Sequence, residues 1–227
     1  VGKLVQLWVS RFEYYQKQSL VKYIYEFENR GKEVGVTMPH PHGQLYAFPF
    51  VPLKIETELV NCKNYYEKHG RNMLEDMIIE EKRDGSRVIF ETDTFLVFLP
   101  HFTDYPYGIF IVSKLPKVHI NEFNIDQQNE LGIVLKLVNG MFDSLYDKLF
   151  PYMMCMHQGA VNHEKWINQE DYYRFHIEFY PPWRSEDVIK YYASSEMGAW
   201  AAANTRNVED TAVELKNALG KFKSKYS

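Results

Sequence analysis

Pro39-His40-Pro41-His42-Gly43-Gln44 places two histidines one residue apart, each preceded by a proline. If this segment is extended, side chains alternate, so both imidazoles face the same side. The prolines fix the backbone around His40, and Gly43 lets a bulky anion approach the backbone closely. The Gln44 amide can donate a hydrogen bond to an oxyanion without a proton to lose. The motif therefore predicts a histidine nucleophile for phosphorus, and the alternative is a proline-rich turn with incidental histidines.

The composition is that of an ordinary globular protein, long enough for a sizeable core. Of the 227 residues, 45% are hydrophobic and 25% charged, and a net charge of -4 offers no global field to nucleic acid. The two cysteines, Cys62 and Cys155, form no CxxC pair, which argues against a disulfide framework. No apolar run approaches transmembrane length. We therefore expect a cytoplasmic protein without a nucleic acid or membrane partner.

The chain starts abruptly at Val1. Apolar residues then follow at helical spacing without a preceding Ser, Thr, Asp or Asn cap: Leu4, Leu7, Trp8, Phe12 and Tyr15. We therefore expect a fragment that begins inside or just before a helix.

Hydrophobic periodicity predicts the remaining elements. Helices are expected over residues 3–18, 54–69, 73–83, 126–149 and 208–221, with Gly220 capping the last one. Strands are expected over residues 20–28, 40–50, 87–91, 95–99, 108–113, 152–157 and 172–180. Residues 159–171 read as a polar loop. The polar loop 29–37 contains glycines and amides that could hold an anion, although a simple connection is the alternative.

Helix, strand, polar loop and histidine-containing strand occur twice, at residues 3–50 and 126–180. The second copy has three strands in front of its helix and the first copy has none. This pattern predicts an internal repeat whose first strands are missing from the chain, and chance similarity of two common units is the alternative.

A second polar group is expected on neighbouring strands. His176 and Glu178 share a face by their period-two spacing, His157 could meet them across the strand pair, and Glu58 could approach. Such a set suits a transition metal, although satisfied sheet histidines are an equal alternative. The other histidines have no partners that the spacing suggests and are treated as surface or structural: His69, His101, His119 and His163.

Two stretches resemble one family closely. They are His40-Pro41-His42-Gly43-Gln44, preceded by Asn29 and Gly35, and Phe175-His176-Ile177-Glu178-Phe179-Tyr180-Pro181-Pro182, followed by Arg184-Ser185. Nearly the whole chain resembles galactose-1-phosphate uridylyltransferases, the transferase branch of the histidine-triad superfamily. Histidine-triad hydrolases usually have a third histidine where this sequence has Gln44.

The resemblance implies an α+β fold in which two histidine-triad repeats form one largely antiparallel sheet with packed helices, usually in a homodimer. On this basis we expect an incomplete first repeat over residues 1–52 and a helical connector over 53–86. The second repeat is expected over 87–182 and a C-terminal tail and helix over 183–227.

The resemblance also implies a ping-pong reaction. A histidine attacks the α-phosphorus of UDP-glucose and releases glucose 1-phosphate, and galactose 1-phosphate then takes the uridylyl group. His42 matches the nucleophile and Gln44 the amide that holds the phosphoryl oxygens. Positions near the phosphates are matched by Asn29, Gly35 and Thr37, next to the anion approach expected at Gly43, and positions near the hexose by Lys190 and Glu196. A neutral amide at residue 44 cannot act as a general base for water, which favours transfer over hydrolysis.

Two metal sites are implied by the same resemblance. His40 matches a zinc ligand whose family partners, a CxxC pair and another histidine, have no counterpart in this sequence. Glu58, His157 and His176 match three ligands of a second, iron-type site, which could take iron or zinc. The fourth position holds a histidine in the best-known relatives and Glu178 here, and a carboxylate can also ligate.

Two rival functions remain open at this point. One is another nucleotidylyltransferase on the same scaffold, such as an ADP-hexose phosphorylase. The other is a non-catalytic nucleotide-binding paralogue, against which the presence of both His42 and Gln44 argues.

Overall fold

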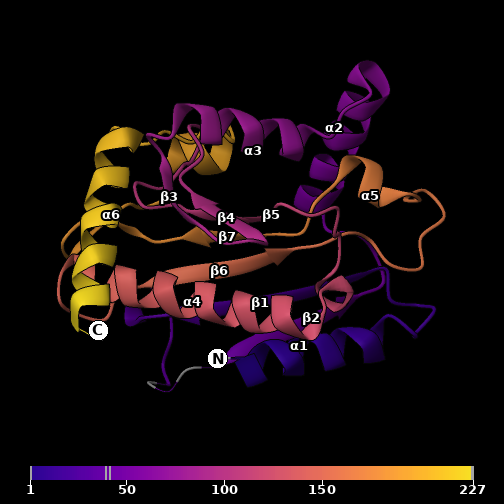
Figure 1. Cartoon of the computed structure of the whole chain (residues 1–227), viewed down its shortest axis with the longest axis horizontal. Coiled ribbons are helices and arrows are strands. Elements are labelled where there is room, and N and C mark those ends of the chain that lie inside the picture. Colours follow the sequence, from indigo (N-terminus) through magenta and orange to yellow (C-terminus); the bar gives the residue numbers. More distant parts are fainter. Residues whose placement is uncertain (1, 39, 41, 226–227) are drawn as a thin grey trace.

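A twisted antiparallel sheet forms the centre of the structure (Figure 1). The computed structural model describes residues 2–38, 40 and 42–225. Within these residues the main sheet has seven strands, in the spatial order β2 (Gly43–Phe48), β1 (Tyr23–Arg30), β6 (Tyr152–His157), β7 (His176–Tyr180), β5 (Phe110–Ser113), β4 (Phe95–Phe98) and β3 (Val88–Glu91). Every neighbouring pair is antiparallel, which confirms the predicted α+β class.

Helices cover both faces of this sheet. On one side lie α1 (Gly2–Tyr15) and α4 (Ile125–Leu145), and α6 (Val208–Lys225) packs on α4 and β3. On the other side lie α2 (Leu53–His69) and α3 (Met73–Asp84) (Figure 1). The largest hydrophobic cluster joins α1, α4 and α6 to the sheet, and smaller clusters lie beneath α2 and α3. A sheet covered on both faces buries both sets of side chains along its central strands.

Local sequence explains where the helices begin and which side they bury. In α1 the buried residues Val5, Trp8, Val9 and Phe12 recur at helical spacing. Asn124 and Gln127 form a capping box at the start of α4, and Asn72 caps α3 by accepting hydrogen bonds from two backbone N–H groups.

Two helix–strand–strand units have the same order along the chain. The first is α1–β1–β2 and the second is α4–β6–β7, and β1 pairs with β6 to join them in one sheet. In the second unit β7 also pairs with β5, whereas β2 stands at the end of the described sheet. The predicted repeat is thus visible in the topology, and the division at residues 52, 86 and 182 stays a prediction.

Short elements complete the fold. They are the 3-10 turns η1 (Lys32–Val34) and η2 (Ile120–Glu122), the helical turn α5 (Gln169–Tyr172), the hairpin β8 (Trp183–Ser185) and β9 (Val188–Ile189), and the π turn η3 (Ser194–Gly198). The turn α5 interrupts the predicted polar loop 159–171, and β7 starts at His176 rather than at residue 172.

Several predicted boundaries were wrong for physical reasons. The strand expected over 40–50 spans only Gly43–Phe48. The helix expected over 126–149 ends at Leu145, because Asp147 adopts a left-handed backbone with φ of 53°. Gly220 does not cap α6. The helix continues because Phe222 packs on Gly140 of α4, where an added Cβ would lie 2.3 Å from the Phe222 ring.

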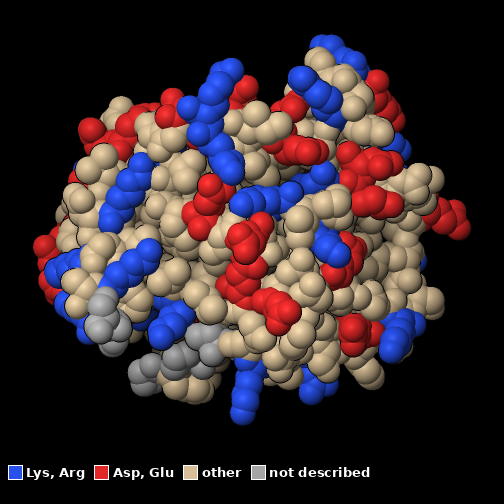
Figure 2. All heavy atoms as spheres, viewed as in Figure 1, with Lys and Arg blue, Asp and Glu red and all other residues tan. Residues whose placement is uncertain are grey.

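The surface carries both signs of charge. On the face shown in Figure 2, lysines and arginines are interspersed with aspartates and glutamates. Of the helices in the described part of the chain, none is long and apolar enough to cross a membrane.

Candidate functional site

His42 lies directly before β2, and its ring is oriented by the backbone of the same motif. Its Nδ1 is 3.0 Å from the carbonyl oxygen of His40. Because a carbonyl oxygen only accepts hydrogen bonds, Nδ1 carries the proton, and Nε2 of the neutral ring keeps its lone pair. The two rings have centroids 5.6 Å apart, and the predicted role of Pro39 and Pro41 lies outside the described residues. His42 thus presents a nucleophilic nitrogen on a partly exposed side chain.

Gly43 and Gln44 begin the edge strand β2. Gln44 lies opposite Phe27 of β1 and is half-buried. Gly43 lies over Trp8 of α1, whose Nε1 would be 3.6 Å from an added Cβ. This distance is ordinary van der Waals contact, so packing on α1 does not itself require a glycine here, and the predicted approach of an anion stays a prediction.

The loop between β1 and β2 forms one wall of a pocket of about 500 Å³. Asn29 and Thr37, which the resemblance placed near the phosphates, line it together with His40, which the resemblance matched to a zinc ligand. Gly35 ends the η1 turn with φ of 80°, a conformation that favours glycine, but it does not line the pocket. His42, Gly43 and Gln44 likewise lie outside its lining. The structure therefore assembles only part of the predicted phosphate-binding set in this pocket.

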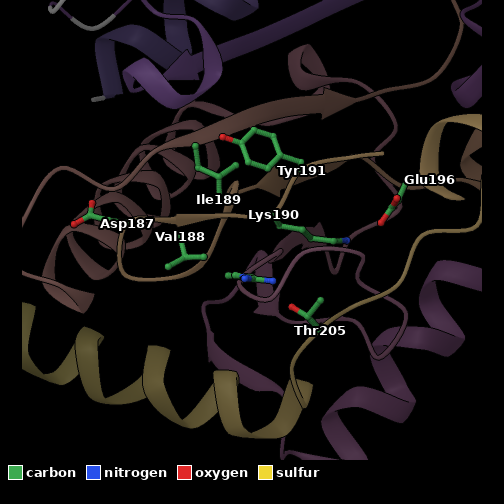
Figure 3. A pocket seen from close by; sticks show the side chains of 8 residues that line it. Asp187, Val188, Ile189, Lys190, Tyr191, Glu196 and Thr205 are labelled. Carbon is green, nitrogen blue, oxygen red and sulfur yellow. The ribbon is translucent and has the colours of Figure 1, made fainter. Parts of the chain in front are cut away.

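Lys190 and Glu196 line a second pocket of about 550 Å³, and Figure 3 shows the Lys190 side chain extended in the direction of Glu196. The Lys190 ammonium donates to the carbonyl oxygen of Asp104 and lies 5.3 Å and 5.0 Å from the ring centroids of Tyr105 and Tyr192. Burial lowers the pKa of Lys190. The Glu196 carboxylate accepts from the backbone of its own turn. Both groups already have partners, so their predicted role at a hexose stays a prediction.

The second polar group forms where two strand ends meet a helix. His157 at the end of β6 and His176 at the start of β7 are directly opposite in the sheet, and Glu178 follows on the same face. Glu58 reaches them from α2, whose apolar residues Ile55 and Leu59 pack toward the sheet. The predicted convergence of these four side chains is confirmed, and we call them the His/Glu cluster.

The donor atoms of the His/Glu cluster all lie within 4.8 Å of one another. Nδ1 of His157 is 2.9 Å from Glu58, and its Nε2 is 3.7 Å from Glu178. Nε2 of His176 is 3.4 Å from Glu178 and 3.9 Å from Glu58. Four ligands at about 2.1 Å from one ion in a tetrahedron are about 3.4 Å apart. The His/Glu cluster could therefore hold a transition metal after small side-chain adjustments.

Surrounding groups orient these ligands. Nδ1 of His176 donates to the carbonyl oxygen of Arg174 at 3.0 Å, which leaves Nε2 to accept a proton or a metal. The Tyr173 hydroxyl donates to Glu58 at 2.9 Å. Lys54 donates to Glu178 at 2.7 Å, and the Tyr180 hydroxyl donates to the same oxygen. The sequence analysis missed these supporting residues, although Lys54 stands one helical turn before Glu58 and Tyr180 shares a strand face with Glu178.

The electrostatics of the His/Glu cluster favour ionised carboxylates. Burial opposes the charged form of Glu178, but His157, His176 and Lys54 outweigh it and hold its pKa well below the usual range. The pKa of Glu58 is lowered in the same way, chiefly by His157 against the effect of burial. Burial would lower the pKa of His176, yet its hydrogen bond to Glu178 and the nearby negative charges raise it. The two carboxylates are therefore held ionised in a largely buried site by the histidines and Lys54.

Comparison with known proteins identifies the family. Residues 58–225 match the family described as galactose-1-phosphate uridyl transferase, C-terminal domain, and residues 1–52 match the N-terminal domain of the same family. The chain belongs to the galactose-1-phosphate uridyl transferase family.

Similar proteins from distant organisms agree with this assignment. A galactose-1-phosphate uridylyltransferase of Thermotoga maritima is 39% identical over 216 residues, which cover 95% of this chain and 66% of that protein. The Saccharomyces cerevisiae uridylyltransferase is 32% identical over 202 residues, 88% of this chain and 54% of that one. The chain thus spans between about half and two thirds of the length of these curated family members.

Solved structures match over nearly all of the chain. One described as a structure of uridylyltransferase has a TM-score of 0.89 at 26% identity and covers 97% of this chain and 68% of its own. An ADP-glucose phosphorylase from Arabidopsis thaliana has a TM-score of 0.83 at 22% identity, with 95% and 66% covered, and shows the same fold. Membership of the galactose-1-phosphate uridyl transferase family is therefore supported by both sequence and structure.

Proposed function

We propose that this chain carries the nucleophile of a nucleotidylyltransferase that converts UDP-glucose and galactose 1-phosphate to glucose 1-phosphate and UDP-galactose. The observation that carries the proposal is the 3.0 Å contact between Nδ1 of His42 and the His40 carbonyl oxygen, because a carbonyl only accepts and the lone pair is then left on Nε2. Membership of the uridyl transferase family gives the substrates.

The proposed reaction takes two displacements at phosphorus. Nε2 of His42 forms a bond to the α-phosphorus, and the bond from that phosphorus to the bridging oxygen breaks, so the electron pair leaves with glucose 1-phosphate. A phosphate oxygen of galactose 1-phosphate then attacks the same phosphorus and returns the electron pair to Nε2. The hydrogen bond from Nδ1 of His42 to the His40 carbonyl stabilises the positive charge on the ring in between.

Neighbouring residues have supporting roles in this proposal. The Gln44 amide donates to the phosphoryl oxygens and cannot take a proton from water, which protects the intermediate from hydrolysis. Asn29, Gly35, Thr37 and Gly43 are proposed near the phosphates, and the pocket that Asn29 and Thr37 line supports the placement of these two. Lys190 and Glu196 are proposed near the hexose.

Metal binding differs between the two predicted sites. The His/Glu cluster fits a divalent ion, iron or zinc, which would tie β6, β7 and α2 together. His40 belongs to no group of three or more potential ligands among the residues that the structure describes. A zinc ion at His40 therefore has no supporting ligand set here, and no proposed step uses one.

A homodimer and a cytoplasmic location complete the proposal, both on family resemblance. The free, buried thiols of Cys62 and Cys155 support a reducing compartment.

Isotope exchange tests the proposed ping-pong order. The chain is incubated with UDP-glucose and labelled glucose 1-phosphate, without galactose 1-phosphate. We expect label in UDP-glucose, because the first displacement reverses through the His42 intermediate. The His42→Gly variant should show no exchange, whereas the distant His69→Ala variant should behave as the wild type. Exchange with ADP-glucose instead would assign the chain to the phosphorylase alternative, and exchange with neither nucleotide would refute the proposal.

A further inference from the structure

A pocket of about 350 Å³ opens onto the His/Glu cluster. Its polar lining includes Lys54, Glu58, His176 and Glu178, and its apolar lining includes Phe102 and Phe110, whose ring stacks on His176 with the centroids 5.8 Å apart. The exposed Phe102 stands at the surface end of this lining. An ion can therefore reach the His/Glu cluster from solvent without unfolding of the surrounding helices.

Lys54 lines this pocket beside three of the four residues of the His/Glu cluster. Its ammonium is 2.7 Å from Glu178 and 4.0 Å from Glu58, so it contacts both carboxylates that would bind an ion. The side chain is 59% exposed and lies over the Tyr180 ring, 4.8 Å from its centroid. This position is fixed by the helix, because Lys54 and Glu58 are four residues apart on α2.

The ammonium and a divalent cation compete for the same negative charge. Without an ion, Lys54 offsets part of the repulsion between Glu58 and Glu178, which have no other lysine or arginine in salt-bridge contact among the described residues. With an ion present, two cationic groups share these carboxylates and repel each other. We propose that Lys54 acts as a built-in counter-ion that lowers the affinity of the His/Glu cluster for divalent metal, so that the bound ion exchanges with solvent.

The proposal goes beyond the proposed transferase function and does not depend on His42. The role of Lys54 is tested by metal affinity and thermal unfolding, and the transferase reaction is tested by isotope exchange. A negative result in one test therefore does not affect the other proposal. The ammonium is partly screened by water, and we therefore expect its removal to raise zinc affinity by about tenfold.

The test compares three variants of the full 227-residue chain. Lys54→Met removes the charge and keeps the aliphatic stem, Lys54→Arg keeps the charge, and Lys68→Met is a matched control on the last turn of α2. All carry His40→Ala and His42→Ala, so that these histidines do not bind zinc. Zn²⁺ is titrated against a chromophoric chelator, and the melting temperature is measured with EDTA and with excess Zn²⁺.

We expect Lys54→Met to bind Zn²⁺ about tenfold more tightly than the parent, while Lys54→Arg and Lys68→Met stay within about twofold of it. Lys54→Met should also melt lower in EDTA and gain more from added Zn²⁺ than the parent. Weaker zinc binding in Lys54→Met would show that Lys54 orients Glu178 as a ligand and would overturn the proposal. Equal affinity in both proteins, or binding in neither, would overturn it as well.

Discussion

Glu26 gives the sharpest prediction about stability. This residue of β1 is completely buried, on the strand face that it shares with the buried Ile24. One carboxylate oxygen accepts from Nε2 of Gln158 at 2.7 Å, and the other has no hydrogen-bond partner among the described residues. Burial raises the pKa of Glu26 from 4.5 to about 8. The folded protein therefore holds Glu26 in its neutral form at pH 7.

The sign of the pH dependence follows from proton binding. Below pH 4.5 both the folded and the unfolded chain hold the proton, so Glu26 costs nothing. As pH rises from 4.5 toward about 8 the unfolded chain releases the proton and the folded chain keeps it, so stability falls. At about 1.4 kcal/mol per pKa unit, the cost is about 1 kcal/mol at pH 5 and about 3 kcal/mol at pH 7.

Glu26→Gln removes this cost, because the amide is neutral at every pH and can still accept from Gln158. We expect the free energy of unfolding of Glu26→Gln, relative to the wild type, to rise by about 2 kcal/mol between pH 5 and pH 7. Urea denaturation at both pH values measures this difference, and other titrating groups cancel in the comparison. The exposed Glu13→Gln variant is the control. A difference that does not change with pH would refute the argument.

Three further predictions test the site and the packing. Gln44→His should raise the ratio of UMP release to UDP-galactose formation, because an imidazole can activate water, and an unchanged ratio would remove residue 44 from control of the intermediate. Gly140→Ala should lower the free energy of unfolding, measured by urea denaturation, by about 1–3 kcal/mol, since the new Cβ would meet the Phe222 ring. In a Phe222→Ala background the same substitution should be nearly neutral, and an equal cost in both backgrounds would contradict this. Asn72→Ala should cost about 1–2 kcal/mol through loss of the α3 cap, with the exposed Asn64→Ala as a neutral control.

Much of the His/Glu cluster could be predicted from the sequence, because side chains along a strand point to the same face at every second residue. His176 and Glu178 had to share a face, and a neighbouring strand supplied His157. Glu58 could be named from the sequence only as a residue able to approach, and its match to a ligand came from family resemblance, since nothing in the spacing places α2 against that strand face. Lys54 was missed because its contact with Glu178 spans 124 residues and depends on the packing of the helix.

The same limits explain other differences. Apolar and polar side chains do alternate over residues 20–28. This alternation does not separate a buried face from a solvent-exposed face, because helices cover both faces of the sheet and Glu26 is buried. The contact of the Lys190 ammonium with the Asp104 carbonyl was not predicted, because it joins residues 86 positions apart in the sequence. Gly220 resembled a helix cap, whereas tertiary contact of Phe222 with Gly140 extends α6. In each case a contact distant in sequence overrode a local preference.

In the proposed reaction His42 carries the uridylyl group between the two displacements. Mass spectrometry of the protein after incubation with UDP-glucose measures this directly, with peptide mapping to locate the adduct. We expect one uridylyl group on His42 that is lost in acid and stable in alkali, as a phosphoramidate is, and no adduct in His42→Gly. An adduct on another residue, or the same amount of adduct in His42→Gly, would contradict it.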